Sequence, residues 1–158
     1  MRAEIGASQI ASISKAGIWT TTVRETVSTL ITAWAHLGVT RIGLISPYVA
    51  SVSDQLRVVL ADAGIQVTHF ASFDEPTEER VVRISPDSIT AAAIAMAHAE
   101  DCDAVFLSCT NLRTLDVIER IETQIGKPVL SSNQVLAWHL CRLLDIAPQH
   151  PQFGRLFD

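Results

Sequence analysis

Four short apolar segments alternate with segments of helical spacing, and this alternation constrains the fold more than any other feature of the chain. Continuous runs of Val, Ile, Leu and Phe are typical of strands buried on both faces of a sheet. A helix between successive strands returns the chain to the same end of the sheet, so the strands run parallel. The pattern therefore predicts an α/β fold, a parallel sheet flanked by helices. The strand-like segments are residues 41–46, 65–70, 104–108 and 128–130.

Charge and hydropathy exclude several classes of function. The 158 residues carry a net charge of −5, and the 12 Lys and Arg residues are scattered, so no basic stripe is present to bind nucleic acid. No apolar run approaches the ~20 residues that a membrane-spanning helix needs. The N-terminal sequence MRAEIGASQI lacks the apolar core of a signal peptide. We therefore expect a cytoplasmic protein without a membrane or nucleic-acid partner.

Cysteine and histidine spacing gives no sign of a metal or cofactor. The three cysteines, Cys102, Cys109 and Cys141, have no CxxC spacing, which argues against a disulfide framework and a zinc site. No two histidines stand at a metal-ligand spacing, and glycine-rich nucleotide-binding motifs are missing. We interpret Cys102, which stands among carboxylates, and Cys141, on the apolar face of the last predicted helix, as structural.

Polar residues follow three of the predicted strands. In open parallel sheets, ligands bind beyond the carboxyl ends of the strands. Residues 46–48 (SPY), 108–111 (SCTN) and 131–134 (SSNQ) stand at such ends. Their convergence at one edge of the sheet predicts a binding site there.

Among these strand-end residues, Cys109 is the strongest candidate for a catalytic residue. It follows an apolar strand and precedes a predicted helix over residues 112–125. The free N–H groups and partial positive charge of a helix N-terminus stabilise a thiolate, the form that acts as a nucleophile or carries protons. Thr110 and Asn111 add side-chain donors that could hold a carboxylate. The alternative is a buried cysteine that packs as a small apolar side chain, as most free cysteines do.

The other strand-end residues have weaker signals. Tyr48 is the only tyrosine. Its hydroxyl could bind a carboxylate, or the residue could be a partly exposed tyrosine whose ring only packs. Ser131, Ser132 and Asn133 could bind substrate or only cap the last helix. The acidic segment 74–79 is interpreted as a solvated face, with a substrate lid or a dimer contact as the alternatives.

The residues around Cys109 resemble a known family. SCTN at 108–111, GKPVLSSNQ at 126–134 and the Pro47-Tyr48 loop together resemble the maleate cis-trans isomerase and arylmalonate decarboxylase branch of the Asp/Glu/hydantoin racemase superfamily. Within this branch the chain looks nearest to ectoine-utilisation proteins. The motifs span roughly residues 17–146, and their combination is specific to the branch.

The resemblance implies a pseudosymmetric enzyme of two flavodoxin-like α/β halves, each supplying one active-site position at a strand end. In the racemases and isomerases both positions are cysteines, and no metal, pyridoxal phosphate or nucleotide is required. Cys109 then matches the second-half cysteine, and Tyr48 matches a tyrosine that binds a substrate carboxylate. Asn111 replaces a histidine common in amino-acid racemases, which favours the dicarboxylate branch.

The N-terminal part departs from the family pattern, because no cysteine precedes Cys102. We expect residues 1–38 to be a remnant of the first half, 39–130 the complete second half, and 131–158 a C-terminal helix and tail that pack back on the first half. A truncated chain of this kind is expected to have little activity alone and to form homodimers.

Three functions remain open from the sequence. The first is a cofactor-independent, cysteine-based isomerase or racemase that acts at a carbon next to a carboxylate, maleate isomerase-like, with ectoine catabolism as one setting. The second is an arylmalonate-type decarboxylase that uses Cys109 alone. The third is a non-catalytic remnant that binds small acids. In each case the predicted partner is a small carboxylate.

Overall fold

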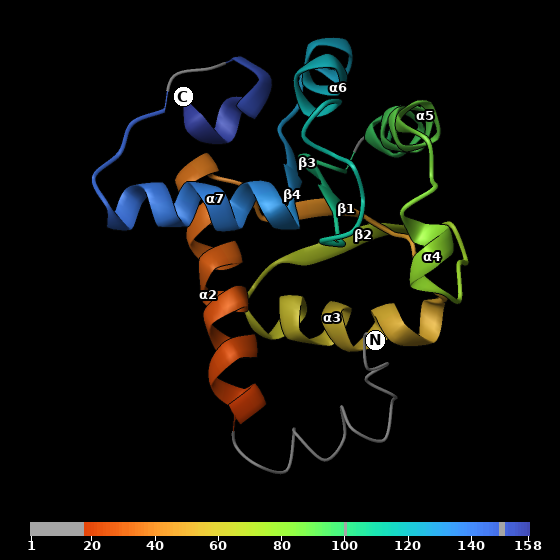
Figure 1. The fold of residues 1–158 in the computed structure, drawn as a ribbon, viewed down its shortest axis with the longest axis horizontal. Coiled ribbons are helices and arrows are strands. Elements are labelled where there is room, and N and C mark those ends of the chain that lie inside the picture. Colours follow the sequence, from red (N-terminus) through yellow and green to blue (C-terminus); the bar gives the residue numbers. More distant parts are fainter. Residues whose placement is uncertain (1–17, 100, 149–150) are drawn as a thin grey trace.

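A parallel β-sheet lies at the centre of the computed structural model, which describes residues 18–99, 101–148 and 151–158. Within these residues the sheet has four strands in the order β2-β1-β3-β4 (Figure 1). All three strand pairings are parallel, as the sequence predicts. The strands are β1 (Arg41–Ser46), β2 (Gln66–Ser72), β3 (Ala104–Leu107) and β4 (Val129–Ser131).

Helices cover both faces of this sheet (Figure 1). Alternate strand residues point to opposite faces, so Ile42 and Leu44 belong to one apolar core while Ile45 belongs to the other. The core on the Ile45 side packs against α5 and α6, and the core on the Leu44 side packs against α2, α3 and α7. The helices are α2 (Ile18–Leu37), α3 (Ala50–Asp62), α4 (Glu78–Val81), α5 (Pro86–Ala97), α6 (Ile118–Ile125) and α7 (Ser132–Leu143).

The strand order places a topological switch point between β1 and β3. The chain moves outward from β1 to β2 on one side and then crosses to β3 on the other side. At such a point the loops that follow the two central strands diverge and leave a crevice, where open α/β sheets bind ligands. The loop after β1 begins at Pro47, and the loop after β3 carries Cys109.

The helix predicted over residues 112–125 is wrong in its first half. Residues 108–117 form turns, and α6 begins only at Ile118. Leu112 and Val117 are buried, 2% and 1% exposed, so an irregular loop buries apolar side chains that the prediction assigned to a helix. The predicted end is confirmed, because Gly126 adopts a left-handed φ of 69° and closes α6. Cys109 is therefore not at a helix N-terminus.

The last helix, α7, begins with a capping box. The Ser131 hydroxyl accepts the Gln134 N–H, and the Gln134 side chain accepts the Ser131 N–H. The middle of α7 packs on α2, where the ring centroids of His36 and Trp138 lie 5.3 Å apart. The expected division of the chain into a first-half remnant (1–38), a complete second half (39–130) and a C-terminal helix and tail (131–158) stays a prediction. Residues 1–17 lie outside the described part of the chain.

None of the helices among the described residues combines the length and apolarity that crossing a bilayer requires.

Candidate active site

Tyr48 and Cys109 meet at the switch point. Ile45 of β1 pairs with Leu107 of β3, so the residues that follow these two strands emerge side by side. The Tyr48 hydroxyl lies 3.1 Å from the Cys109 sulfur, within hydrogen-bond distance. The structure thus brings together two residues that the sequence placed at separate strand ends.

The sulfur of Cys109 is both buried and hydrogen-bonded. The residue is 6% exposed and belongs to the same apolar core as Leu112 and Val117. The backbone N–H of Asn111 donates to the sulfur at 3.1 Å. A turn therefore supplies one of the amide donors that the sequence analysis expected from a helix N-terminus. Two polar contacts distinguish this sulfur from one that packs only against apolar side chains.

Glu78, in α4, completes the cluster and was missed by the sequence analysis. The Tyr48 hydroxyl donates to its Oε1 at 2.8 Å, and the Asn111 side-chain amide donates to its Oε2 at 2.5 Å. The interpretation of residues 74–79 as only a solvated face is wrong for Glu78. Val81 of the same helix is fully buried and fixes α4 against the core that contains Cys109.

Tyr48 is held in its protonated form. Burial, the contact with Cys109 and the contact with Glu78, in that order, raise the pKa of Tyr48 well above its usual value near 10. A phenol hydroxyl has one hydrogen to donate. While that hydrogen points to Glu78, the Tyr48 oxygen can only accept from Cys109.

The loop that carries Tyr48 is held by the hydroxyl groups of three serines. The Tyr48 N–H donates to the Ser46 hydroxyl at 3.2 Å, and Ser53 of α3 donates to the same hydroxyl at 2.8 Å. The Ser72 hydroxyl, at the end of β2, donates to the Tyr48 carbonyl. Ser46 and Ser53 are buried, and these contacts hold the backbone of Tyr48 in place.

The third predicted segment reaches the site only through Asn133. Its side-chain amide donates to the Thr110 carbonyl at 2.8 Å and ties the first turn of α7 to the Cys109 loop. Ser131 is fully buried and its hydroxyl caps α7, so capping accounts for this residue. Thr110 is exposed and Ser132 is half-buried.

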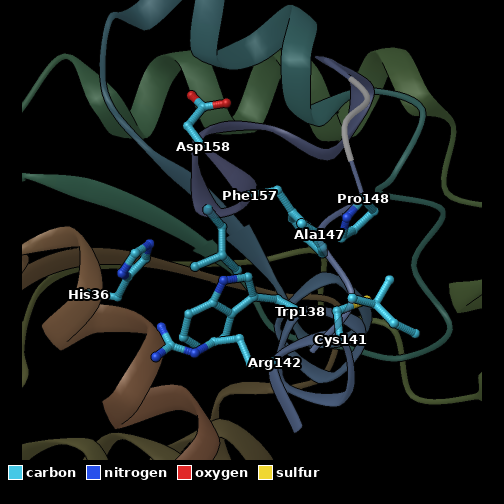
Figure 2. Close-up of a pocket in the computed structure, with 10 residues that line it drawn as sticks. His36, Trp138, Cys141, Arg142, Ala147, Pro148, Phe157 and Asp158 are labelled. Carbon is cyan, nitrogen blue, oxygen red and sulfur yellow. The ribbon is translucent and has the colours of Figure 1, made fainter. Parts of the chain in front are cut away.

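The other two cysteines lie elsewhere. Cys102 is 1% exposed, and its thiol donates to the Ala104 carbonyl; burial, more than the nearby carboxylates, raises the pKa of this thiol. Cys141 lines a pocket of about 180 Å³ between α2, α7 and the C-terminal segment (Figure 2). None of the predicted site residues lines that pocket.

No group of three or more His, Cys, Asp or Glu side chains in the described part of the chain is arranged to hold a metal ion. At the switch point the described residues bring together the Cys109 thiol, the Tyr48 phenol, the Glu78 carboxylate and the amide donors of Asn111.

Fold and site together define a parallel α/β domain with a cysteine and a tyrosine at its switch point. The family model described as arylmalonate decarboxylase matches residues 12–157. The chain belongs to the arylmalonate decarboxylase family, and the resemblance to the maleate isomerase and arylmalonate decarboxylase branch is confirmed, while the nearness to ectoine-utilisation proteins stays a prediction.

Individual relatives lie in both parts of the expected branch. An arylmalonate decarboxylase from Bordetella bronchiseptica is 34% identical over 124 residues, which cover 77% of this chain and 52% of that protein. A maleate isomerase from Geobacillus stearothermophilus is 28% identical over 137 residues, which cover 86% and 54%. A solved structure of unliganded arylmalonate decarboxylase aligns with a TM-score of 0.76 at 30% identity, covering 84% of this chain and 59% of that chain. The chain spans about half the length of the curated relatives it matches.

Proposed function

We propose that this chain supplies the Cys109 side of a cofactor-independent enzyme that isomerises or racemises a small acid at a carbon next to its carboxylate. The observation that carries the proposal is the 3.1 Å approach of the Tyr48 hydroxyl to the Cys109 sulfur at the switch point. Relatives named maleate isomerase support the isomerase assignment.

In this proposal Cys109 transfers the proton, and Tyr48 and Asn111 bind the substrate carboxylate. Cys109 gives a proton to the reacting carbon, or takes one from it, on one face of the substrate. Tyr48 and the Asn111 side chain donate hydrogen bonds to the substrate carboxylate, on which enediolate charge develops. A donor of this kind is typically worth about 3 kcal/mol in the transition state. A group from outside this chain's described residues acts on the opposite face.

Decarboxylation of a malonate-type acid is the second candidate. The family match over residues 12–157 and the 34% identical relative favour it. The bond between the central carbon and one carboxyl group breaks, carbon dioxide leaves, and the electron pair moves onto the remaining carboxylate as an enediolate. The Cys109 thiol then protonates the carbon, so this route needs only one cysteine.

Protection of Cys109 from alkylation tests whether the site binds acids at all. We expect maleate or phenylmalonate to slow the reaction of Cys109 with iodoacetamide, read by mass spectrometry of the Cys109 peptide. The Y48F and N111A variants should lose this protection while keeping the fold. Equal alkylation of wild-type Cys109 with and without either acid contradicts the proposal.

Product analysis separates the two candidates and the third alternative, a non-catalytic module that binds small acids. Proton NMR distinguishes fumarate formed from maleate and phenylacetate formed from phenylmalonate. C109S should abolish whichever product the wild-type chain forms. Protection without either product is the result expected of the non-catalytic module.

We also propose roles for the remaining residues of the predicted site. Thr110 and Ser132 complete the substrate-binding set, whereas Asn133 and Ser131 hold the loop and the helix that position the site. We propose that the protein is a cytoplasmic homodimer. A role in ectoine catabolism stays a prediction. Support for the dimer comes from exposed leucines on and just after α7, which are Leu136, Leu140, Leu143 and Leu144. Light scattering of the purified chain measures the oligomeric state.

A further inference from the structure

The two side chains assigned to a substrate carboxylate already hold a carboxylate of the chain itself. Tyr48 donates to Oε1 of Glu78 at 2.8 Å, and the Asn111 amide donates to Oε2 at 2.5 Å. Each oxygen of one carboxylate thus meets one donor, which is the pattern that a bound acid would make. We propose that Glu78 is an internal competitor that fills the carboxylate subsite of the free protein and leaves it when an acid binds. This inference rests on the proposed function.

The position of Glu78 allows it to leave without disturbing the fold. Val81, in the same short helix, is fully buried against the core that contains Cys109, so the backbone of α4 is anchored. Glu78 itself is exposed. Its side chain can rotate into water, where the carboxylate is fully hydrated, while Val81 stays in place. Charge contacts at exposed positions are weak, so a substrate can displace this one.

Release of Glu78 also changes the hydrogen bonding of the thiol. The single hydroxyl hydrogen of Tyr48 cannot serve Glu78 and Cys109 at the same time. Once Glu78 leaves, that hydrogen is free for the carboxylate of the substrate or for the sulfur 3.1 Å away. Binding of an acid therefore changes whether the Tyr48 hydroxyl can donate a hydrogen bond to the Cys109 sulfur.

The rival explanation is that Glu78 is a strut that holds Tyr48 and Asn111 in place. The two explanations predict opposite signs. Removing a strut loosens both donors and weakens acid binding. Removing a competitor leaves both donors free, and since Tyr48 is also fixed through its backbone by Ser46 and Ser72, acid binding strengthens.

The experiment compares the wild-type chain with E78A, E78Q and E79A. Glu79 is the adjacent exposed residue, so E79A removes the same charge one position away and serves as the matched control. Malonate is the reversible probe, followed by its protection of Cys109. Iodoacetate and iodoacetamide are the covalent probes. Both alkylate a thiolate by displacing iodide, but only iodoacetate carries a carboxylate.

In E78A we expect malonate to bind about fivefold more tightly, the change typical of losing one exposed charge contact. The ratio of the iodoacetate rate to the iodoacetamide rate at Cys109 should rise by a similar factor. E78Q should lie between E78A and the wild type, because the amide oxygen can still accept from one donor. E79A should match the wild type.

Weaker or unchanged malonate binding in E78A, or an equal effect in E79A, overturns the inference. If malonate protects wild-type Cys109 but E78A brings no gain, the inference fails and the proposed function stands. If malonate protects Cys109 in none of the variants, E78A included, both fail.

Discussion

The Tyr48 hydroxyl lies 3.1 Å from the Cys109 sulfur across 61 positions of sequence. This contact follows from topology, because parallel pairing of β1 with β3 brings their carboxyl ends together wherever the chain has travelled between them. The chain between these two residues makes α3, β2, α4, α5 and β3, and α4 returns to the site through Glu78. The site therefore combines two strand ends with one residue of a short helix.

Replacing Tyr48 by Phe removes the hydroxyl and keeps the ring. We expect malonate to bind about tenfold more weakly, since a hydrogen bond to a charged group contributes about 1.5 kcal/mol. The free energy of unfolding in urea should change little, because the packed ring remains. Binding is measured by protection of Cys109. Unchanged protection in this variant would show that the hydroxyl does not contact the acid.

The ionisation of Tyr48 gives a direct reading of its surroundings, because the chain has no other tyrosine. Burial and the contacts with Cys109 and Glu78 raise its pKa in the folded chain, while the unfolded chain ionises near pH 10. As pH rises past about 10, the unfolded state loses this proton first, so the contribution of Tyr48 to stability falls.

Tyrosinate absorbance checks this in an alkaline titration. The folded chain should show no tyrosinate until well above pH 10, and E78A should shift the midpoint down without reaching the value measured in urea. A native midpoint equal to that in urea contradicts the burial of the hydroxyl.

The sheet could be predicted because its signals are local. The apolar runs of β1 and β3 mark buried strands, and the polar residues after β1, β3 and β4 mark the edge where a site belongs. The helix expected from residue 112 failed at its start because the apolar residues Leu112 and Val117 are buried from an irregular segment that precedes Ile118. Periodicity reports which residues are buried, and an irregular loop can bury the same residues.

Glu78 could not be found from the sequence for a different reason. Its partners Tyr48 and Asn111 are 30 and 33 positions away, on opposite sides along the chain. It lies in the acidic segment 74–79, and acidic residues are mostly exposed in proteins. Five of these six residues are indeed exposed, so the segment gave no sign of a binding site. The structure shows why the segment packs against the core, because Val81, three positions further on, is fully buried there.

Asn133 should act on Cys109 through the loop that it holds. N133A and N133D both lose the donor to the Thr110 carbonyl, and N133D keeps the side-chain shape while adding charge. We expect Cys109 to react about threefold faster with iodoacetamide in both variants, as a loop loosened by about 0.7 kcal/mol would allow. A faster reaction in N133D alone would point to the added charge instead of the lost hydrogen bond.

Glu122 connects the C-terminal segment to the sheet, and its loss should be the most destabilising change considered. The residue is 5% exposed, and its two oxygens accept the N–H groups of Val129 in β4 and of Arg155. In E122A both amides lose their partner, so we expect the free energy of unfolding to fall by about 2 kcal/mol. Amide exchange near Arg155 should accelerate, whereas E119A, an exposed residue on the same helix, should leave both measurements unchanged.

The pH dependence of this loss has a defined sign. Burial raises the pKa of Glu122, so the folded chain holds this proton more tightly than the unfolded chain does. The contribution of Glu122 to stability is therefore fully present below its unfolded pKa, near 4.3, and declines as pH rises through the raised folded value. The destabilisation by E122A should accordingly be larger at low pH than at neutral pH. Urea unfolding of both chains across this range measures it, and a loss that grows toward neutral pH would show that the two backbone amides stabilise the charged carboxylate more than burial opposes it.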